Sequence, residues 1–209
     1  MAELLLPFAA DSSEKLAVAD EFGSTDWKNF NERVNQLVHA LTRQGLKPGD
    51  AFSVLSGNRR EYVEAFAAAA HGGWLLVPIN WHLVASEISY ILENSESKAF
   101  LIDSRFYELG MQTISLENAP NISPIVVMGE PERDTSTQHR NIFTYEEFLS
   151  QEKNHEPENQ SLGGPMFYTS GTTGHPKGVK SALSQTGTPV GTLKMIGDGL
   201  SGMLSIEPG

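Results

Sequence analysis

The feature that most constrains this fold is an alternation of short apolar runs with amphipathic segments between residues 51 and 102. Three runs have the length and composition of buried strands: AFSVL (51–55), WLLVPIN (74–80) and KAFLI (98–102). A helix is predicted after each of the first two runs. Asn58 and Glu61 fit a capping box for the first helix, Gly72-Gly73 is placed to end it, and SEISYILEN (86–94) is the second. This order predicts an α/β fold, a mostly parallel sheet with flanking helices.

The same kind of pattern continues on both sides of this region. Upstream, apolar residues recur at helical spacing before Gly45 and a turn at residues 47–50: Trp27, Phe30, Val34, Leu37, Val38 and Leu41. Downstream, SPIVVM (123–128) predicts a strand, and Thr144 with Glu147 predicts a cap for a short helix over 145–149. Residues 129–140 are predicted to form a loop. Trp74 and Trp81 are expected to pack in the core.

Composition excludes several classes of function. The 209 residues contain no cysteine, which excludes disulfides, thiolate zinc sites and a cysteine nucleophile. A net charge of -11 argues against a nucleic-acid-binding surface, which needs clustered Lys and Arg. No apolar run approaches the roughly 20 residues of a membrane span, and the N-terminus is a poor signal peptide. The six histidines lack metal-binding spacing. We therefore expect a cytoplasmic protein with no transmembrane segment.

The stretch MFYTSGTTGHPKGVK (166–180) is the strongest candidate for a functional site. Gly171 and Gly174 allow the backbone to approach a ligand closely, and successive amide groups in such a turn form an anion-binding nest. Hydroxyl donors come from Ser170, Thr172 and Thr173, and Lys177 adds a mobile positive charge. These residue types together predict a phosphate-binding loop.

This loop does not fit the Walker A pattern, which requires Gly, four residues, Gly, Lys and then Ser or Thr. Counted from Gly171, the second glycine position is occupied by Pro176, and Gly178 stands where the hydroxyl residue belongs. The residues after Lys177 also lack a helical pattern. The loop is therefore predicted to bind phosphate in another structural context.

The segment YTSGTTGHPKGV resembles the signature phosphate loop of the adenylate-forming (AMP-binding) superfamily, which includes acyl-CoA synthetases, luciferases and peptide-synthetase adenylation domains. Residues 37–103 also resemble the N-terminal region of that family, with HGGWLLVPIN matching a conserved segment. The resemblance covers roughly residues 22–180 and is closest to bacterial fatty-acyl-CoA synthetases. It implies the N-terminal portion of the large domain of an adenylate-forming enzyme.

The resemblance also implies a reaction and a set of site residues. In the family, a small-molecule carboxylate attacks the α-phosphorus of ATP to give an acyl-adenylate, and CoA then displaces AMP. Lys177 would be the catalytic cation, and Thr169 would be a ligand of Mg²⁺. The β- and γ-phosphates would be held by Thr169, Ser170, Gly171, Thr172, Thr173, Gly174 and Lys177. ATP, Mg²⁺ and CoA are the implied cofactors, and a fatty acid is the expected carboxylate.

Domain organisation follows from the same resemblance and, for the connector, from its charged composition with Asn and Gly. Residues 1–209 are expected to form an incomplete N-terminal AMP-binding domain: an α/β subdomain (22–128), a mobile connector (151–164), a strand and phosphate loop (166–180) and a truncated tail (181–209). We expect residues 1–209 alone to form no acyl-CoA. One alternative is an inactive product with at most weak nucleotide binding, and another is an unrelated phosphate-binding protein with a coincidental loop. The sequence leaves open whether the chain forms a homo-oligomer.

Overall fold

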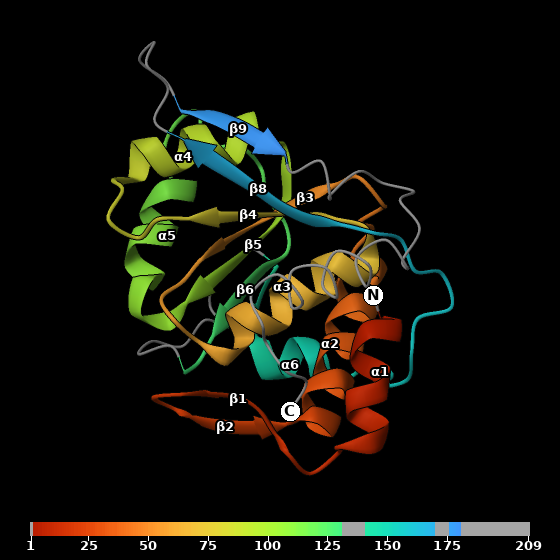
Figure 1. The fold of residues 1–209 in the computed structure, drawn as a ribbon. Helices are drawn as coiled ribbons and strands as arrows, with labels where there is room; N and C mark the ends of the chain where they lie inside the picture. Colours follow the sequence, from red (N-terminus) through yellow and green to blue (C-terminus); the bar gives the residue numbers. More distant parts are fainter. Residues whose placement is uncertain (1, 131–140, 170–175, 181–209) are drawn as a thin grey trace.

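The computed structural model describes residues 2–130, 141–169 and 176–180, and its centre is a seven-stranded sheet (Figure 1). Its strands are β3 (Ala51–Leu55), β4 (Leu75–Ile79), β5 (Ser97–Asp103), β6 (Ile125–Met128), β7 (Ile142–Thr144), β8 (Gly164–Thr169) and β9 (Lys177–Lys180). They lie in the order β7-β6-β5-β3-β4-β8-β9. Every neighbouring pair is parallel except β8 and β9. The predicted mostly parallel sheet is confirmed.

Helices cover both faces of this sheet (Figure 1). One core contains residues of α2 (Trp27–Arg43), α3 (Arg60–Gly72) and α6 (Tyr145–Ser150), and the other contains residues of α4 (Ala85–Asn94) and α5 (Tyr107–Ile114). Strand β3 shows the division, since Phe52 and Val54 belong to the first core and Leu55 belongs to the second. Because both faces of a parallel strand are buried, its sequence is continuously apolar rather than alternating.

The remaining described elements lie at the N-terminus and after β5. They are α1 (Ala2–Asp11), the antiparallel pair β1 (Leu16–Asp20) and β2 (Gly23–Asp26), and a short 3-10 helix (Ser104–Phe106). None of these, nor α5 and β7, was predicted. Their short lengths and partly polar sequences give them weak periodicity, so their conformation depends on contacts with the main sheet.

Several predicted element boundaries are confirmed by local geometry. Helix α3 ends at Gly72, and its C-cap residue Gly73 has a left-handed φ of 75°, which favours glycine. The turn at residues 47–50 is closed by a 2.9 Å hydrogen bond from the Asp50 nitrogen to the Lys47 carbonyl. Helix α6 begins with the predicted capping box, in which Thr144 and Glu147 each accept a backbone hydrogen bond from the other.

The capping box predicted for α3 is wrong. The helix begins at Arg60, and its N-cap residue is Arg59 rather than Asn58. The Glu61 carboxylate accepts hydrogen bonds from the Arg59 guanidinium, with the shorter one 2.9 Å long. The Arg60 backbone nitrogen instead donates to Asp20 on β1, at 2.9 Å. A backbone N–H at the start of α3 is thus satisfied by a carboxylate of β1, and not by the neighbouring Asn58 side chain that the capping box would use.

The two tryptophans beside β4 have different environments. Trp74 is 1% exposed and packs in the core, as predicted. Trp81 is 43% exposed, so its predicted core position is wrong. It follows β4, where its ring stacks on His82 and Phe106 at centroid distances of 3.6 and 5.3 Å. These two ring contacts therefore cover part of its apolar surface and leave the rest exposed.

The segment between α6 and β8 has no regular structure and runs along α2. Its side-chain contacts include hydrogen bonds from Asn31 to Glu156 and from Asn35 to the Asn154 carbonyl, at 2.8 and 3.1 Å. Its role as a mobile connector stays a prediction. The greater part of the loop predicted at 129–140 and the tail at 181–209 lie outside the described residues.

Candidate functional site

Strands β8 and β9 form an antiparallel hairpin whose two ends flank the predicted phosphate loop. Thr169 is the last residue of β8 and is paired with Lys177, the first residue of β9. Both are exposed. The predicted site residues between them lie outside the described residues: Ser170, Gly171, Thr172, Thr173 and Gly174. The structure therefore brings together the first and last predicted site residues across one step of a β-ladder.

Backbone contacts determine where β8 joins the sheet. The Ser161 nitrogen donates to the His71 carbonyl at 3.1 Å, and the Gly163 nitrogen donates to the Ala70 carbonyl at 3.3 Å. The Gly164 nitrogen then donates to the Trp74 carbonyl at 2.9 Å, at the start of β4. These three bonds connect the strand to the end of α3 and the start of β4, so the position of the hairpin depends on both elements.

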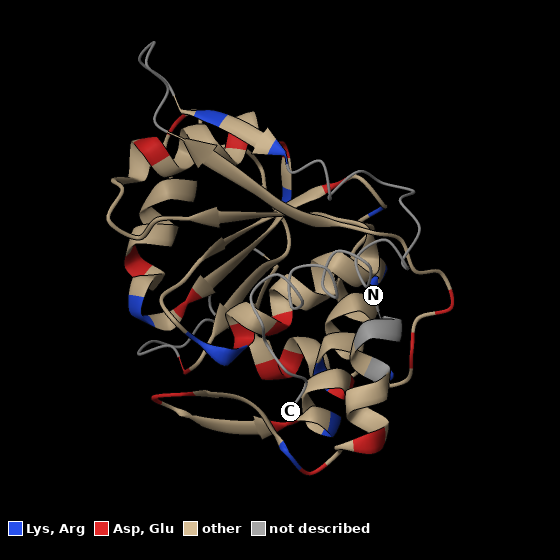
Figure 2. Ribbon diagram, in the orientation of Figure 1, with Lys and Arg blue, Asp and Glu red and all other residues tan. Residues whose placement is uncertain are grey.

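The hairpin is a locally basic feature of an acidic chain. The chain has a net charge of -11, but β8 and β9 contain two lysines and neither aspartate nor glutamate. Figure 2 shows these lysines, Lys177 and Lys180, at the two ends of β9. Both are exposed. An anion approaching this edge of the sheet would therefore meet positive charge, although the molecule as a whole is negative.

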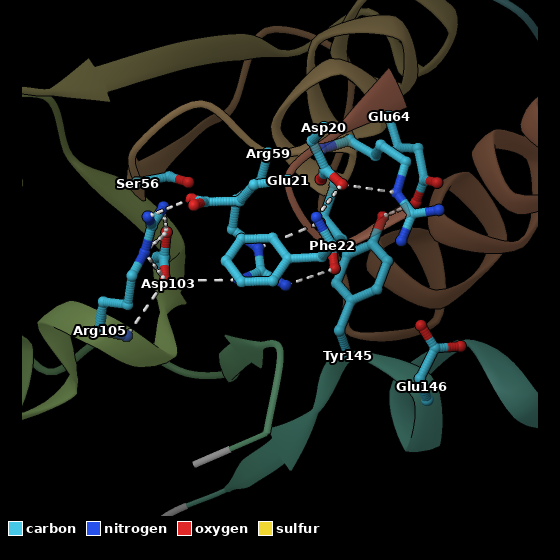
Figure 3. Close-up of polar contacts among 12 residues, drawn as sticks. Asp20, Glu21, Phe22, Ser56, Arg59, Glu64, Asp103, Arg105, Tyr145 and Glu146 are labelled. Carbon is cyan, nitrogen blue, oxygen red and sulfur yellow. Dashed lines mark hydrogen bonds and ion pairs between the residues drawn. The ribbon is translucent and has the colours of Figure 1, made fainter. Parts of the chain in front are cut away.

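A second polar cluster lies where the strand order of the sheet reverses, between the carboxyl ends of β3 and β5 (Figure 3). Asp103 ends β5, and the Arg105 guanidinium donates to its carboxylate at 2.7 Å. The Arg59 guanidinium lies 3.7 Å from the same carboxylate. The Phe22 ring contacts both cations, with its centroid 4.2 Å from the Arg59 guanidinium carbon and 5.3 Å from that of Arg105. A side chain from the turn between β1 and β2 thus packs against this point of the sheet.

The surroundings of Asp103 change its proton affinity. Burial alone would raise the pKa of the carboxyl, because a charge loses solvation in the interior. Hydrogen bonds from the side chain and backbone of Arg105, together with the charges of Arg105 and Arg59, outweigh burial and lower this pKa below the usual value of 3.8. Asp103 therefore stays ionised in the folded chain at neutral pH.

Replacing Asp103 with asparagine is expected to reduce the free energy of unfolding by about 2–4 kcal/mol at pH 7, because two guanidinium groups lose a buried partner. A carboxyl whose folded pKa is depressed stabilises the fold above its unfolded pKa and loses that contribution as the pH falls through the folded pKa. The difference between wild type and Asp103→Asn should therefore be complete above about pH 5 and shrink in more acidic solution. Urea unfolding at several pH values measures it.

The exposed Asp11 provides the control for this series. Asp11→Asn should have an effect within about 0.5 kcal/mol at every pH. A difference between wild type and Asp103→Asn that stays constant down to pH 3 would contradict the lowered pKa.

A buried carboxylate also joins three helices on one face of the sheet (Figure 3). Glu64 on α3 is 1% exposed and accepts hydrogen bonds from Arg33 on α2 and Tyr145 on α6, each 2.8 Å long. Burial raises the pKa of Glu64, and these two partners oppose but do not cancel that effect. Arg33 also pairs with Glu146 at 2.8 Å. The network links α2, α3 and α6 and contains none of the predicted site residues.

Comparison with known proteins identifies the family. The family described as AMP-binding enzyme matches residues 7–194. The chain belongs to the AMP-binding enzyme family. Its relatives include a 3-oxocholest-4-en-26-oate–CoA ligase of Rhodococcus rhodochrous, 32% identical over 168 residues that cover 79% of this chain and 30% of the relative. A medium-chain-fatty-acid–CoA ligase of Ectopseudomonas oleovorans is 28% identical over 156 residues, covering 73% and 28%.

The fold of this member of the AMP-binding enzyme family agrees with solved structures. An anthranilate CoA ligase crystallised with anthranoyl-AMP has a TM-score of 0.76 at 24% identity, over 88% of this chain and 34% of that one. The predicted N-terminal portion of a large adenylate-forming domain is confirmed as the fold class. The chain spans about a third of the length of these relatives. The alternative of an unrelated protein with a coincidental loop is wrong.

Four residues that make polar contacts near these sites were not predicted from the sequence. Tyr90 and Asn94 on α4 contact the hairpin, and Arg59 and Arg105 surround Asp103. The only sequence signal for the first pair is their spacing of four residues, which puts them on one helix face.

Within the described ranges, no helix is long and apolar enough to cross a membrane.

Proposed function

We propose that this chain supplies the phosphate-binding part of an acyl-CoA ligase, which activates a carboxylate with ATP and transfers the acyl group to CoA. The observation that carries the proposal is the β8–β9 hairpin, in which Thr169 and Lys177 are paired at the base of the Ser-, Thr- and Gly-rich loop. Membership of the AMP-binding family and the CoA ligases among its relatives support it. A fatty acid is the proposed substrate, and the proposed location is cytoplasmic.

The proposed reaction has two steps. A carboxylate oxygen attacks the α-phosphorus of ATP, the bond to the β-phosphate oxygen breaks, and pyrophosphate leaves with the bonding electrons. The CoA sulfur then attacks the acyl carbonyl carbon, AMP leaves, and the thiol proton passes to solvent. Negative charge develops on the leaving pyrophosphate in the first step, so a fixed cation near it stabilises the transition state.

The lysine and the loop residues of the hairpin would make different contacts with the phosphates. Lys177 would place its ammonium beside the β- and γ-phosphates and follow the departing pyrophosphate. The loop amides and the hydroxyls of Ser170, Thr172 and Thr173 would donate to phosphate oxygens. Because neither β8 nor β9 carries an acidic side chain, no carboxylate of the hairpin would repel the phosphates.

The described residues of the hairpin would supply at most one ligand to Mg²⁺. Thr169 offers one exposed hydroxyl oxygen at the end of β8. Within the described residues, no group of three His, Asp or Glu side chains is placed to hold a metal. Mg²⁺ often keeps few protein ligands and binds mainly to substrate phosphates, and one neutral oxygen is compatible with this. When bound, the ion would neutralise part of the phosphate charge.

A binding experiment on the 209-residue chain tests the phosphate role directly. We expect calorimetric titration with magnesium pyrophosphate to show weak binding, with a Kd of about 0.1–1 mM. Adenosine, which shares the base and ribose of ATP but has no phosphate, should produce no comparable signal. Absence of any pyrophosphate binding would contradict the proposal.

An exchange assay tests the alternative of an inactive chain. We expect residues 1–209 alone to produce no CoA thioester and no carboxylate-dependent exchange of labelled pyrophosphate into ATP. Robust turnover with a fatty acid would show that this expectation is wrong, and it would leave the phosphate role intact.

A further inference from the structure

Helix α4 contacts strand β8 and the residue that immediately precedes β9. Tyr90 and Asn94 are four residues apart, so their side chains lie on one face of the helix. The Tyr90 hydroxyl donates a 3.2 Å hydrogen bond to the carbonyl oxygen of Pro176. The Tyr168 hydroxyl on β8 donates a 2.7 Å hydrogen bond to the Asn94 side-chain oxygen. One helix face is therefore bonded to the hairpin on both sides of the loop.

The Pro176 contact constrains the backbone immediately before Lys177. Proline has a restricted φ and no N–H, so its carbonyl oxygen is the only group through which it can form a hydrogen bond. Pro176 is partly buried, whereas Lys177 is exposed. Since the Pro176 carbonyl belongs to the peptide unit that enters Lys177, its hydrogen bond limits rotation at the start of the lysine.

The Tyr168 contact constrains the opposite strand and the close packing around it. Tyr168 pairs with Gly178, where an added Cβ would lie 3.2 Å from the tyrosine Cζ and 3.3 Å from the Met166 sulfur. The ring thus lies close to the β9 backbone at Gly178, the residue after Lys177. Burial, with the nearby Tyr90 contributing, raises the pKa of Tyr168 to about 12. Its hydroxyl therefore remains protonated and able to donate at neutral pH.

We propose that Tyr90 is a positioning residue that sets the place of Lys177 through the Pro176 carbonyl, while Asn94 and Tyr168 hold the partner strand. This inference rests on the proposed phosphate role of Lys177. A lysine side chain has four flexible carbons, so its ammonium reaches a phosphate reproducibly only when its backbone is held. Tyr90 acts on the ligand through Lys177 and does not itself contact phosphate.

The test measures two quantities on the 209-residue chain and its variants. One is hydrogen exchange of the β9 amides, and the other is the Kd for magnesium pyrophosphate. Tyr90→Phe removes only the hydroxyl. It is expected to speed exchange in β9 and raise the Kd, each by about threefold to tenfold, while exchange in β3–β6 stays unchanged. Tyr62→Phe removes a hydroxyl from α3, on the other face of the sheet, and should change neither quantity.

The variants separate this inference from the proposed function. If wild type binds pyrophosphate, Lys177→Ala abolishes binding and Tyr90→Phe binds like wild type, the inference is overturned and the proposed function stands. Faster β9 exchange in Tyr90→Phe with an unchanged Kd would also overturn it, because the bond would then hold the strand without positioning the lysine. If wild type itself fails to bind pyrophosphate, the proposed function is overturned, and the inference that rests on it is withdrawn.

Discussion

Replacing Gly163 with alanine is expected to lower the free energy of unfolding by more than about 4 kcal/mol. Single substitutions cause a loss of this size only when they severely disrupt the packed interior. A Cβ at this position would overlap the carbonyl oxygens of Ala69 and Trp74 and lie 2.5 Å from the Trp74 nitrogen. These are backbone atoms, so no side-chain rotation can relieve the overlap. Relief requires the strand to move away from β4, which breaks the pairing of Leu75 with Gly164. Urea unfolding measures the loss.

Gly45→Ala is a matched control because it separates steric overlap from backbone strain. An added Cβ at Gly45 meets nothing within 4 Å, but its φ of +96° is unfavourable for alanine. That substitution should cost about 1–2 kcal/mol. If Gly163→Ala costs no more than Gly45→Ala, the close approach of residue 163 to the end of α3 and the start of β4 is wrong. Where Gly163→Ala is insoluble on expression, proteolysis of freshly made chain gives the same comparison.

Replacing Lys177 with alanine is expected to lower kcat by about 10²–10³-fold in an active ligase that contains residues 1–209. The cation acts on charge that grows as pyrophosphate departs, so its loss should affect kcat more than the KM for ATP. In the 209-residue chain, the same variant should lose measurable pyrophosphate binding. Steady-state kinetics and calorimetry measure the two effects separately.

Lys180→Ala is the control for charge alone. Lys180 is exposed at the far end of β9, where it pairs with Met166, roughly 10 Å along the strand from Lys177. It should lower kcat by no more than about twofold, since exposed charges at that distance are largely screened by salt. Equal losses in the two variants would mean that the hairpin acts only through its general positive charge, and the specific role of Lys177 would be contradicted.

Much of the central sheet was predictable because its strands are buried on both faces. A strand such as β3 must be apolar along its whole length, so its limits are visible as the run AFSVL. Helix α2 was equally clear, since its buried positions recur every three or four residues over 17 residues. Short elements such as β7 and α5 lack this redundancy, and their sequences alone did not distinguish them from loops.

The start of α3 shows how a local rule can lose to a distant contact. Asn58 and Glu61 have the spacing of a capping box. In the structure, however, the Arg60 nitrogen donates to the Asp20 carboxylate. The Glu61 carboxylate instead accepts hydrogen bonds from the Arg59 guanidinium. Charged hydrogen bonds between segments about 40 residues apart carry no periodic signal. The cluster around Asp103 was missed for the same reason.

The sequence by itself determined the α/β class, the position of the candidate loop and the residue types that make it suitable for phosphate. Those properties depend on local composition, spacing and conformational freedom, which are readable along the chain. Only the tertiary structure decided that Thr169 pairs with Lys177. It also decided that Gly163 lies in close contact with backbone atoms at the end of α3 and the start of β4. The hydrogen bond from Tyr90 on α4 to the Pro176 carbonyl was likewise visible only there. These relations join segments that are far apart in sequence, and they exist only once the sheet and its helices have packed.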